Sequence, residues 1–385
     1  MLCLPDAGGF NARPVLIVAA LLACLPARAA DVITAPLTMA RSCPLVPVQV
    51  NEAGPYLFLL DTCLRLPVLD AAVVAHLGLP EFSGGAPSPS QPAEARRLTL
   101  AALRVAGLDT PDATCVVADL AALQQRLGVQ AAGLLPAHQP GYELVLDFPA
   151  RTAAWLPLDR ADLTGPGDGI LPVTFDASGA PCVEAVIDGV TLPLRIDTAL
   201  ADVVALGETT APVQQAVRDA RPDLETMLDV AGQRIARQTR LGELSVGGAK
   251  WFSPVCACLP GDAARLGMGF LRQFRVTLNF EHGLAQLQRD GSSALADPPL
   301  AGFGLSLGGL AEGLWWLHVA LGSPASAAGL RAGDRLVAVD GVSAAHVPAE
   351  TLEAYLRGEA GQEREFTIDR TGQTVQVRLA ATRLL

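Results

Sequence analysis

Apolar and polar residues alternate over most of the chain in short runs that end at Gly, Pro or Asn, which is the pattern of β-strands joined by turns. The first clear example is a hairpin, in which the run 45–50 turns at a Gly-containing loop and returns as 56–60. Two short helices are predicted, one over 69–78 that Gly78 closes and one over 118–128. The pattern therefore predicts a mainly β protein with few helices.

The pattern of the first half of the chain starts again in the second half. The hairpin at 171–196 leads to Asp197 in the same way that the earlier hairpin leads to Asp61. The distance along the chain from each Asp to a later matching position, Pro136 or Gly267, is also similar. Similar internal spacing predicts two copies of one structural unit. The other matching segments are 133–136 with 265–271 and 142–148 with 274–280.

The composition leaves room for a large core and excludes one class of partner. The chain has 385 residues, of which 50% are hydrophobic and 17% charged, so it can hold two or three domains. Its net charge is -11, whereas binding of nucleic-acid phosphates needs clustered basic residues. We therefore expect no nucleic-acid partner.

Residues 1–30 have the features of an export signal. Arg13 precedes the apolar stretch 14–25, and a small-x-small cleavage site follows. The stretch is too short for a transmembrane helix, so the sequence predicts an exported protein, periplasmic or secreted. Residues 21–24 resemble a bacterial lipoprotein box, and lipidation of Cys24 would instead anchor the protein to a membrane. The nearby cleavage site favours the alternative that Cys24 is only part of the apolar core of the signal.

The cysteines and histidines suggest no metal site and no cofactor. An exported protein can form disulfides, but the sequence leaves their pairing open. The chain has no His-Glu-x-x-His and no Gly-x-Ser-x-Gly motif, so neither a metallopeptidase nor a Ser-His-Asp hydrolase is expected. The cysteines that remain after the signal are Cys43, Cys63, Cys115, Cys182, Cys256 and Cys258.

Each copy of the repeat carries one carboxylate directly after an apolar run. The first copy has Asp61-Thr62 and the second has Asp197-Thr198. A run of large apolar residues before an Asp is typical of a buried strand that ends in a functional turn. Both segments resemble the catalytic loop of the aspartic peptidases, in which the family motif is Asp-Thr/Ser-Gly.

This resemblance implies a two-lobed, retropepsin-like β-fold, with lobe 1 over 43–158, lobe 2 over 170–290 and a substrate cleft between them. It also implies that Asp61 and Asp197 are the catalytic pair and share one proton, because two facing carboxylates cannot both ionise easily. One carboxylate would accept a proton from a water molecule while the other donates a proton to the substrate carbonyl oxygen. The two threonines would cross-link the loops through hydroxyl–backbone hydrogen bonds.

The two segments depart from the family motif in ways that leave two functions open. Cys63 could be held in a disulfide, and Arg65 could pair with Asp61 and keep it ionised, which would prevent proton sharing. A buried Asp-Thr can also be a structural turn without catalysis. The chain is therefore either an active aspartic endopeptidase or a peptidase-like fold that only binds peptides. The departures are Cys63 and Ala199 at the Gly position, Arg65 and Ala201 at a following Ser position, and Pro136 in place of a Gly.

The chain changes character after a linker at 288–299. The segment 322–341 contains Ser-Pro-Ala-x-x-Ala-Gly-Leu and Gly-Asp-x-Leu, and it closely resembles the core of a bacterial PDZ domain, here over 300–385. The resemblance implies a small α+β domain that adds a peptide to its sheet edge and holds the terminal carboxylate on backbone N–H groups. The helix 348–357 would line the peptide groove. The carboxylate-binding loop would be Gly302, Phe303, Gly304 and Leu305.

The two resemblances together imply an exported aspartic-type endopeptidase whose PDZ domain recruits protein or peptide substrates, including C-terminal peptides. A monomer is expected, because one chain supplies both lobes. The alternative is a peptide-binding protein that has lost catalysis. The chain also ends in the apolar pair Leu384-Leu385, so the tail of one molecule could occupy the PDZ groove of another.

Overall fold

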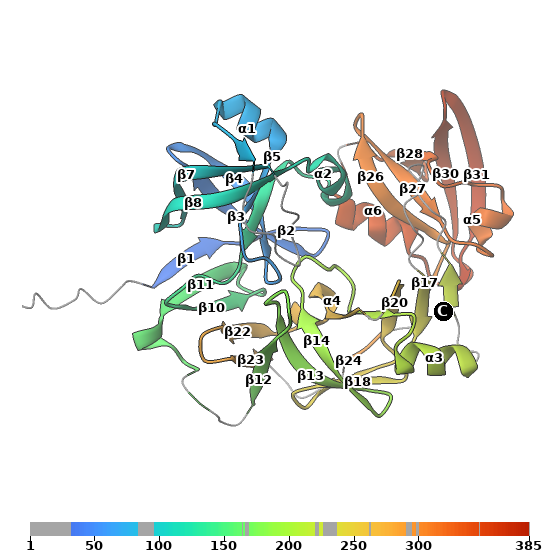
Figure 1. The fold of residues 1–385 in the computed structure, drawn as a ribbon. Coiled ribbons are helices and arrows are strands. Elements are labelled where there is room, and N and C mark those ends of the chain that lie inside the picture. The colour runs from blue at the N-terminus through green and yellow to red at the C-terminus, as the bar shows by residue number, and fades with distance from the viewer. Residues whose placement is uncertain are drawn as a thin grey trace, which may run out of the picture. The chain divides into compact units, whose positions relative to one another are not determined.

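The computed structural model describes residues 32–83, 96–163, 165, 169–219, 223–225, 237–261, 263–289, 295–297, 300–345 and 347–384. Strands dominate these residues and the helices are short, so the mainly β prediction is confirmed (Figure 1). The predicted export signal, with Cys24, lies outside the described residues. No helix in the described part of the chain is long and apolar enough to cross a membrane.

The first copy of the repeat folds as a sheet with the strand order β2-β3-β4-β9-β5-β8-β7-β6. The predicted hairpin forms β3 and β4, and the end of β4 lies parallel to β9 in the middle of the sheet. The two predicted helices are α1 and α2, which end at Gly78 and Gly128 in the left-handed conformation that glycine adopts at low cost. The bounds are β2 Thr38–Ala40, β3 Cys43–Val50, β4 Ala53–Asp61, β5 Val68–Asp70, α1 Ala71–Leu77, β6 Phe82–Ser83, β7 Arg96–Val105, β8 Leu108–Ala118, α2 Ala121–Leu127 and β9 Ala131–Pro136.

The second copy repeats these strand pairings. Strand β14 runs parallel to β21, as β4 runs parallel to β9. Strand β15 lies antiparallel to β21 and parallel to β20, as β5 lies antiparallel to β9 and parallel to β8. The bounds are β13 Pro181–Ile187, β14 Val190–Ile196, β15 Val204–Gly207, α3 Ala211–Arg218, β16 Asp223–Glu225, β17 Arg237–Arg240, β18 Glu243–Val246, β19 Ala249–Phe252, β20 Val255–Leu259, β21 Ala264–Leu266, α4 Met268–Leu271 and β24 Leu295–Ala296.

A run of strands in the order β1-β11-β10-β22-β23-β12 joins the two copies. Strands β10 and β22 meet antiparallel, and Val145 lies opposite Thr277. Because 142–148 and 274–280 are matched segments of the repeat, Val145 and Thr277 are equivalent positions that face each other. The register therefore places a local twofold axis between the two copies. The bounds are β1 Ile33–Pro36, β10 Tyr142–Asp147, β11 Thr152–Pro157, the 3-10 helix η1 Leu158–Arg160, β12 Ile170–Phe175, β22 Arg275–Asn279 and β23 Leu284–Gln288.

The strands that lead to the two aspartates are anchored in one hydrophobic core. Phe58 and Leu60 of β4 have no exposed surface, and Leu194 and Ile196 of β14 are at most 1% exposed. Burial of one such side chain stabilises the fold by about 1.5–3 kcal/mol. The ends of β4 and β14 are therefore held firmly in place by the packing behind them.

The C-terminal part of the chain forms its own sheet, β26-β27-β28-β30-β31, around a separate core. Helix α6 forms where the groove-lining helix is predicted, and α5 begins at Ser323, whose hydroxyl accepts a hydrogen bond from the Ser326 N–H. The bounds are β25 Ala301–Gly302, β26 Leu305–Ala311, β27 Leu314–Val319, α5 Pro324–Ala327, β28 Arg335–Val339, β29 Val342–Ser343, α6 Ala349–Leu356, β30 Glu363–Arg370, β31 Gln373–Ala380 and β32 Thr382–Arg383.

The described end of the chain, up to Leu384, pairs with residues at the start of the PDZ region. Strand β32 pairs with β25, so that Thr382 lies opposite Gly302 and Arg383 opposite Ala301. The Leu384 N–H also donates to the carbonyl of Leu300 at 2.7 Å. The tail is therefore held by its own chain through backbone hydrogen bonds. The hypothesis that the tail occupies the PDZ groove of another molecule stays a prediction, because Leu385 lies outside the described residues.

Candidate active site

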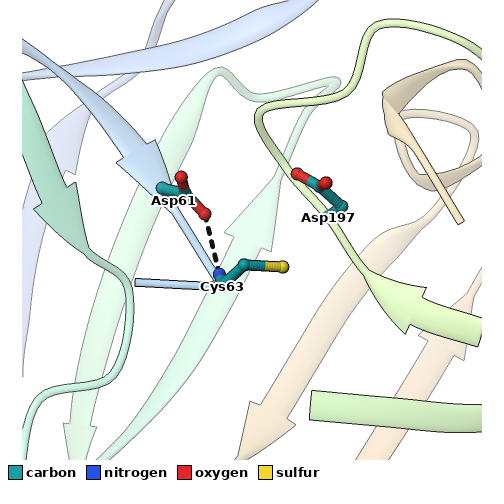
Figure 2. A group of neighbouring side chains, drawn as sticks. All are labelled: Asp61, Cys63 and Asp197. Carbon is teal, nitrogen blue, oxygen red and sulfur yellow. Dashed lines mark hydrogen bonds between the residues drawn. The ribbon is translucent and has the colours of Figure 1, made fainter. Parts of the chain in front are cut away.

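The two aspartates stand at equivalent ends of buried strands. Asp61 closes β4, and its backbone carbonyl accepts a hydrogen bond of 2.9 Å from the Ala137 N–H. Asp197 follows β14, and its backbone N–H donates to the Leu266 carbonyl at 2.9 Å. Their side chains are turned toward the same space (Figure 2), and the two residues are only 7% and 4% exposed. The repeat therefore brings one carboxylate from each copy to a common, buried place.

The threonine after each aspartate ties the two loops together. The Thr62 N–H donates to the Thr198 hydroxyl oxygen, and the Thr198 N–H donates to the Thr62 hydroxyl oxygen, both at 3.1 Å. The Thr198 hydroxyl also donates to the Leu60 carbonyl at 2.7 Å, and the Thr62 hydroxyl donates to the Ile196 carbonyl. Both threonines are at most 3% exposed. This reciprocal set of buried hydrogen bonds fixes the distance between the two loops.

The residues at the family Gly position keep the hydrogen bonds that hold the carboxylates. The Cys63 N–H donates to Asp61 Oδ1 at 2.7 Å, and the Ala199 N–H donates to Asp197 Oδ1 at 2.9 Å. Cys63 is a free thiol, so no disulfide joins it to another cysteine of the described residues. Burial, and then the nearby charges of Asp197 and Asp61, raise the pKa of the Cys63 thiol well above its usual range. The sulfur is therefore a neutral neighbour of the carboxylates.

An arginine makes the two carboxylates unequal. Arg265 Nη1 lies 3.1 Å from Asp197 Oδ2, and the Asp197 side chain is 5% exposed. Burial, and next the charge of Asp197, raise the pKa of Asp61 to about 6, although the Cys63 N–H and Arg265 oppose this shift. Asp61 is thus the member of the pair that keeps a proton in mildly acidic solution. Sequence reasoning did not single out Arg265.

The strand register identifies the residue of the first copy that is equivalent to Arg265. Ile196 is the partner of Leu266 on β21, and Asp61 is the partner of Pro136 on β9. Asp197 therefore aligns with Gly267 as Asp61 aligns with Pro136. Two residues earlier on each strand, Arg265 is equivalent to Leu134. Leu134 packs in an apolar cluster, whereas Arg265 reaches the carboxylate. When the two copies are aligned, a charged residue in one copy matches an apolar residue in the other, and this difference is the signal that the sequence contains.

Arg65 takes a different place from the one that the sequence suggested. Its Nε donates to the Ser178 carbonyl at 2.8 Å, and within the described residues no hydrogen bond or ion pair joins it to Asp61. A Cβ on Gly179 would lie 1.7 Å from the Arg65 guanidinium, so glycine at this position makes room for the arginine. The hypothesis that Arg65 keeps Asp61 ionised is therefore wrong.

A cavity of about 300 Å³ lies beside the Asp61 loop. His138 stacks on Phe280 in its wall, with ring centroids 4.8 Å apart, and burial lowers the pKa of His138. The stacked neutral ring, an aromatic side chain and one guanidinium give the cavity apolar surface with a single basic group. Such a surface suits an apolar or acidic side chain of a peptide. The lining residues are Thr62, Leu64, Arg65, Pro136, His138, Phe175, Gly179 and Phe280.

The same place offers a set of three potential metal ligands. The Cys63 sulfur and one oxygen from each of Asp61 and Asp197 lie within 4.8 Å of one another (Figure 2). Two features disfavour a metal here. The guanidinium of Arg265 already supplies a positive charge to Asp197, and the neutral thiol of Cys63 is a poor ligand.

The predicted carboxylate-binding loop divides between two roles. Phe303 has no exposed surface and packs edge-on against Phe366 with ring centroids 5.0 Å apart, so its side chain belongs to the core. Gly302, Gly304 and Leu305 instead line a cavity of about 190 Å³. The other lining residues are Gln238, Leu300, Ala301, Ser306, Ala320, Leu356, Arg357 and Leu384.

Comparison with known proteins identifies both kinds of domain. Residues 46–137 match the family model described as aspartyl protease, and residues 318–370 match the model described as PDZ domain. The predicted combination of an aspartyl protease region with a C-terminal PDZ domain is therefore confirmed. A search of the curated proteins finds no match.

Two solved structures show more distant likenesses. The crystal structure of basic 7S globulin from soybean is 13% identical, covers 68% of this chain and 95% of its own, and has a TM-score of 0.40. A photosystem II D1 C-terminal processing protease is 27% identical, covers 23% of this chain and 25% of its own, and has a TM-score of 0.21. Neither likeness is close enough to support an argument about function.

Proposed function

We propose that this chain is an exported endopeptidase of the aspartic type, in which Asp61 and Asp197 hydrolyse peptide bonds and the PDZ domain recruits the substrate. The observation that carries this proposal is the meeting of two buried carboxylates from equivalent strand ends. One oxygen of each lies within 4.8 Å of the other, and a backbone N–H fixes each carboxylate. Two buried carboxylates repel each other when both are charged, so their meeting favours a role in proton transfer over a role in stability.

The surroundings of the pair suggest a separate role for each carboxylate. Arg265 forms an ion pair with Asp197, while burial and the charge of Asp197 raise the pKa of Asp61. Asp197 would act as the general base that takes a proton from the attacking water. Asp61 would act as the general acid that donates its proton to the substrate carbonyl oxygen.

The proposed reaction proceeds through a tetrahedral adduct and needs neither a metal nor a covalent enzyme intermediate. The water oxygen bonds to the carbonyl carbon, and the carbonyl oxygen receives the Asp61 proton. When the tetrahedral adduct collapses, the C–N bond breaks, the leaving nitrogen takes the proton from Asp197, and Asp61 recovers a proton from a hydroxyl of the adduct. The pair returns to its starting state. The reciprocal bonds of Thr62 and Thr198 would keep the two carboxylates at a constant separation through this cycle.

The PDZ domain supports the recruiting part of the proposal. Strand β26 is the edge strand of its sheet, and such edges accept a peptide as an additional strand. The cavity at Gly302, Gly304 and Leu305 is lined largely by apolar residues, which suits the apolar terminal residue of a peptide. We propose that this cavity takes C-terminal peptides.

Cleavage of casein, an unstructured protein, between pH 3 and pH 8 tests the catalytic part. The wild type, Asp61→Asn and Asp197→Asn are compared, with Asp109→Asn as the control because Asp109 is an exposed carboxylate paired with Arg104. Loss of either general acid or base is expected to lower the rate by about 10²–10⁴-fold. The control variant is expected to cleave like the wild type. Circular dichroism establishes that each variant is folded.

One observation favours the second candidate function, a peptide-binding protein without catalysis. Arg265 donates to Asp197 Oδ2 at 3.1 Å, which leaves this oxygen less able to accept a proton from a water molecule. If the folded wild type cleaves no substrate at any pH, this ion pair accounts for the loss. The protein would then hold peptides in its cleft and its PDZ groove, and peptide binding would remain to be measured directly.

A further inference from the structure

The groove of the PDZ domain contains a side chain from the first copy of the repeat. The groove lies between the edge strand β26 and helix α6, which pack beside each other. Arg41, from the turn between β2 and β3, reaches both walls of this groove. We propose that the groove is built to hold a guanidinium, that Arg41 fills it within the same chain, and that arginine-containing peptides bind by displacing Arg41.

Three kinds of contact make the site selective for a guanidinium. Arg41 Nε and Nη2 both bond to Glu353 Oε1 of α6, at 2.9 and 2.7 Å. Nη1 donates to the Gly308 carbonyl of β26 at 3.3 Å, and the guanidinium lies over the Trp315 ring at 5.8 Å from its centroid. A carboxylate, a backbone carbonyl and an aromatic face match the donors and the flat surface of arginine. The Arg41 and Glu353 side chains are only 18% and 24% exposed, so this is more than a surface ion pair.

The wall of the groove is shaped to leave the Gly308 carbonyl available. The register of β26 against β27 shifts between Leu307 and Leu310, so Gly308 lies in an irregular part of the strand. A Cβ on Gly308 would come within 2.2 Å of the Trp316 ring, so glycine is needed there. The irregularity therefore belongs to the construction of the site.

The turn that presents Arg41 is also held in a fixed conformation. Arg41 and Ser42 have φ of 44° and 68°, which is uncommon for residues with a side chain. Arg272 donates to the Ser42 hydroxyl at 3.1 Å, and the Cys43 thiol donates to the Ala199 carbonyl at 3.6 Å. Nη1 of Arg41 donates in addition to the Arg126 carbonyl at 3.2 Å. Arg41 is thus aimed at the groove by its own backbone and by its neighbours.

These contacts define the ligand. The atoms of Arg41 stand in for the arginine side chain of a peptide, and the cavity at Gly304, Leu305 and Leu356 has room for an apolar terminal residue. The expected ligand is a peptide with an apolar C-terminal residue and an arginine upstream. Its affinity is reduced by the fraction of molecules in which Arg41 occupies the site. This inference rests on the peptide-binding part of the proposed function and not on the catalytic part.

Fluorescence anisotropy with labelled decapeptides tests the inference. The probes end in Leu, carry one arginine at each upstream position in turn, and have matched peptides with neutral citrulline in its place. The full chain carries Asp61→Asn so that no probe is cleaved. Adding Arg41→Ala is expected to raise the affinity for the best arginine peptide about tenfold. In this variant the matched citrulline peptide should bind more weakly than the arginine peptide. Adding Glu353→Gln to Arg41→Ala is expected to remove the preference for arginine over citrulline.

The control is Arg104→Ala, which removes an exposed arginine of β7 that is paired with Asp109. It is expected to leave every affinity unchanged. If peptides bind but Arg41→Ala has no effect, or if arginine and citrulline peptides bind equally, the inference is wrong while the PDZ domain still binds peptides. If folded protein binds no probe with or without Arg41, the peptide-binding role fails as well. Neither result bears on the catalytic proposal, which the cleavage of casein by the wild type tests separately.

Discussion

The two copies of the repeat have the same strand pairing but different side chains around their aspartates. In the first copy the positions nearest Asp61 hold Cys63, Leu134 and Pro136, and in the second copy the same positions hold Ala199, Arg265 and Gly267. Both copies keep the N–H that holds the carboxylate. The backbone is therefore duplicated while the electrostatics are not. A duplicated fold can place two identical groups together and still give them different electrostatic surroundings.

The matched positions Gly267 and Pro136 should differ most in their tolerance of change. A Cβ on Gly267 would lie 2.3 Å from the Asp202 carbonyl oxygen, so Gly267→Val must displace backbone. We expect this substitution to lower the free energy of unfolding by about 4 kcal/mol or more, measured by urea denaturation. Pro136→Gly is expected to cost about 1 kcal/mol or less. Equal losses of unfolding free energy in Gly267→Val and Pro136→Gly would contradict the expectation that the two copies tolerate change differently at this position.

The raised pKa of Asp61 should make stability depend on pH. A carboxyl group with a pKa of about 6 in the folded state and 3.8 when unfolded stabilises the fold fully below pH 4, and this contribution is lost as pH rises to 6. One pKa unit is worth about 1.4 kcal/mol, so the loss is about 3 kcal/mol. Asp61→Asn removes it, and the variant should gain about this much relative to wild type between pH 4 and pH 7. The exposed Asp109→Asn is the control, and a gain of the same size in that variant would contradict the account.

Of the three positions at which the two copies differ, Cys63 should have the smallest effect on activity and stability. Its N–H carries the hydrogen bond to Asp61, and that bond does not need the sulfur. We expect Cys63→Ala to change the rate of casein cleavage by less than about threefold and the free energy of unfolding by less than about 1 kcal/mol. The neutral thiol should also react slowly with iodoacetamide at pH 7. Rapid alkylation, or loss of activity in Cys63→Ala, would assign the sulfur a direct part in the site.

Local sequence features predicted the elements that carry the site but not all of its contacts. The apolar runs before Asp61 and Asp197 predict buried strands, and the structure has β4 and β14 there. Arg265 was missed because it reaches Asp197 only through the parallel pairing of β21 with β14. No feature close to Asp197 in the sequence reports that pairing. The difference between Leu134 and Arg265 in the aligned repeat was the available clue.

Two other residues show where a family pattern is insufficient. The motif position of Arg65 allows a pairing with Asp61, but Gly179 makes room for the arginine to turn toward the Ser178 carbonyl instead. Phe303 was placed in a peptide-binding loop, but its side chain is fully buried in the core of the PDZ domain. Motifs locate a loop in the chain, whereas packing with distant residues decides where each side chain of that loop lies.

The pH dependence of kcat/KM in wild type and Arg265→Leu tests the central claim, that Arg265 makes the two carboxylates unequal. Leucine is the residue at the matching position of the first copy, so the substitution makes the two copies alike at this point. The wild-type rate should fall as pH rises through about 6, where Asp61 loses its proton. Without the positive charge of Arg265, the ionised form of Asp61 is less stable, so this fall should move to higher pH. An unchanged profile, with the variant folded and active, would show that Arg265 does not set the protonation of the pair.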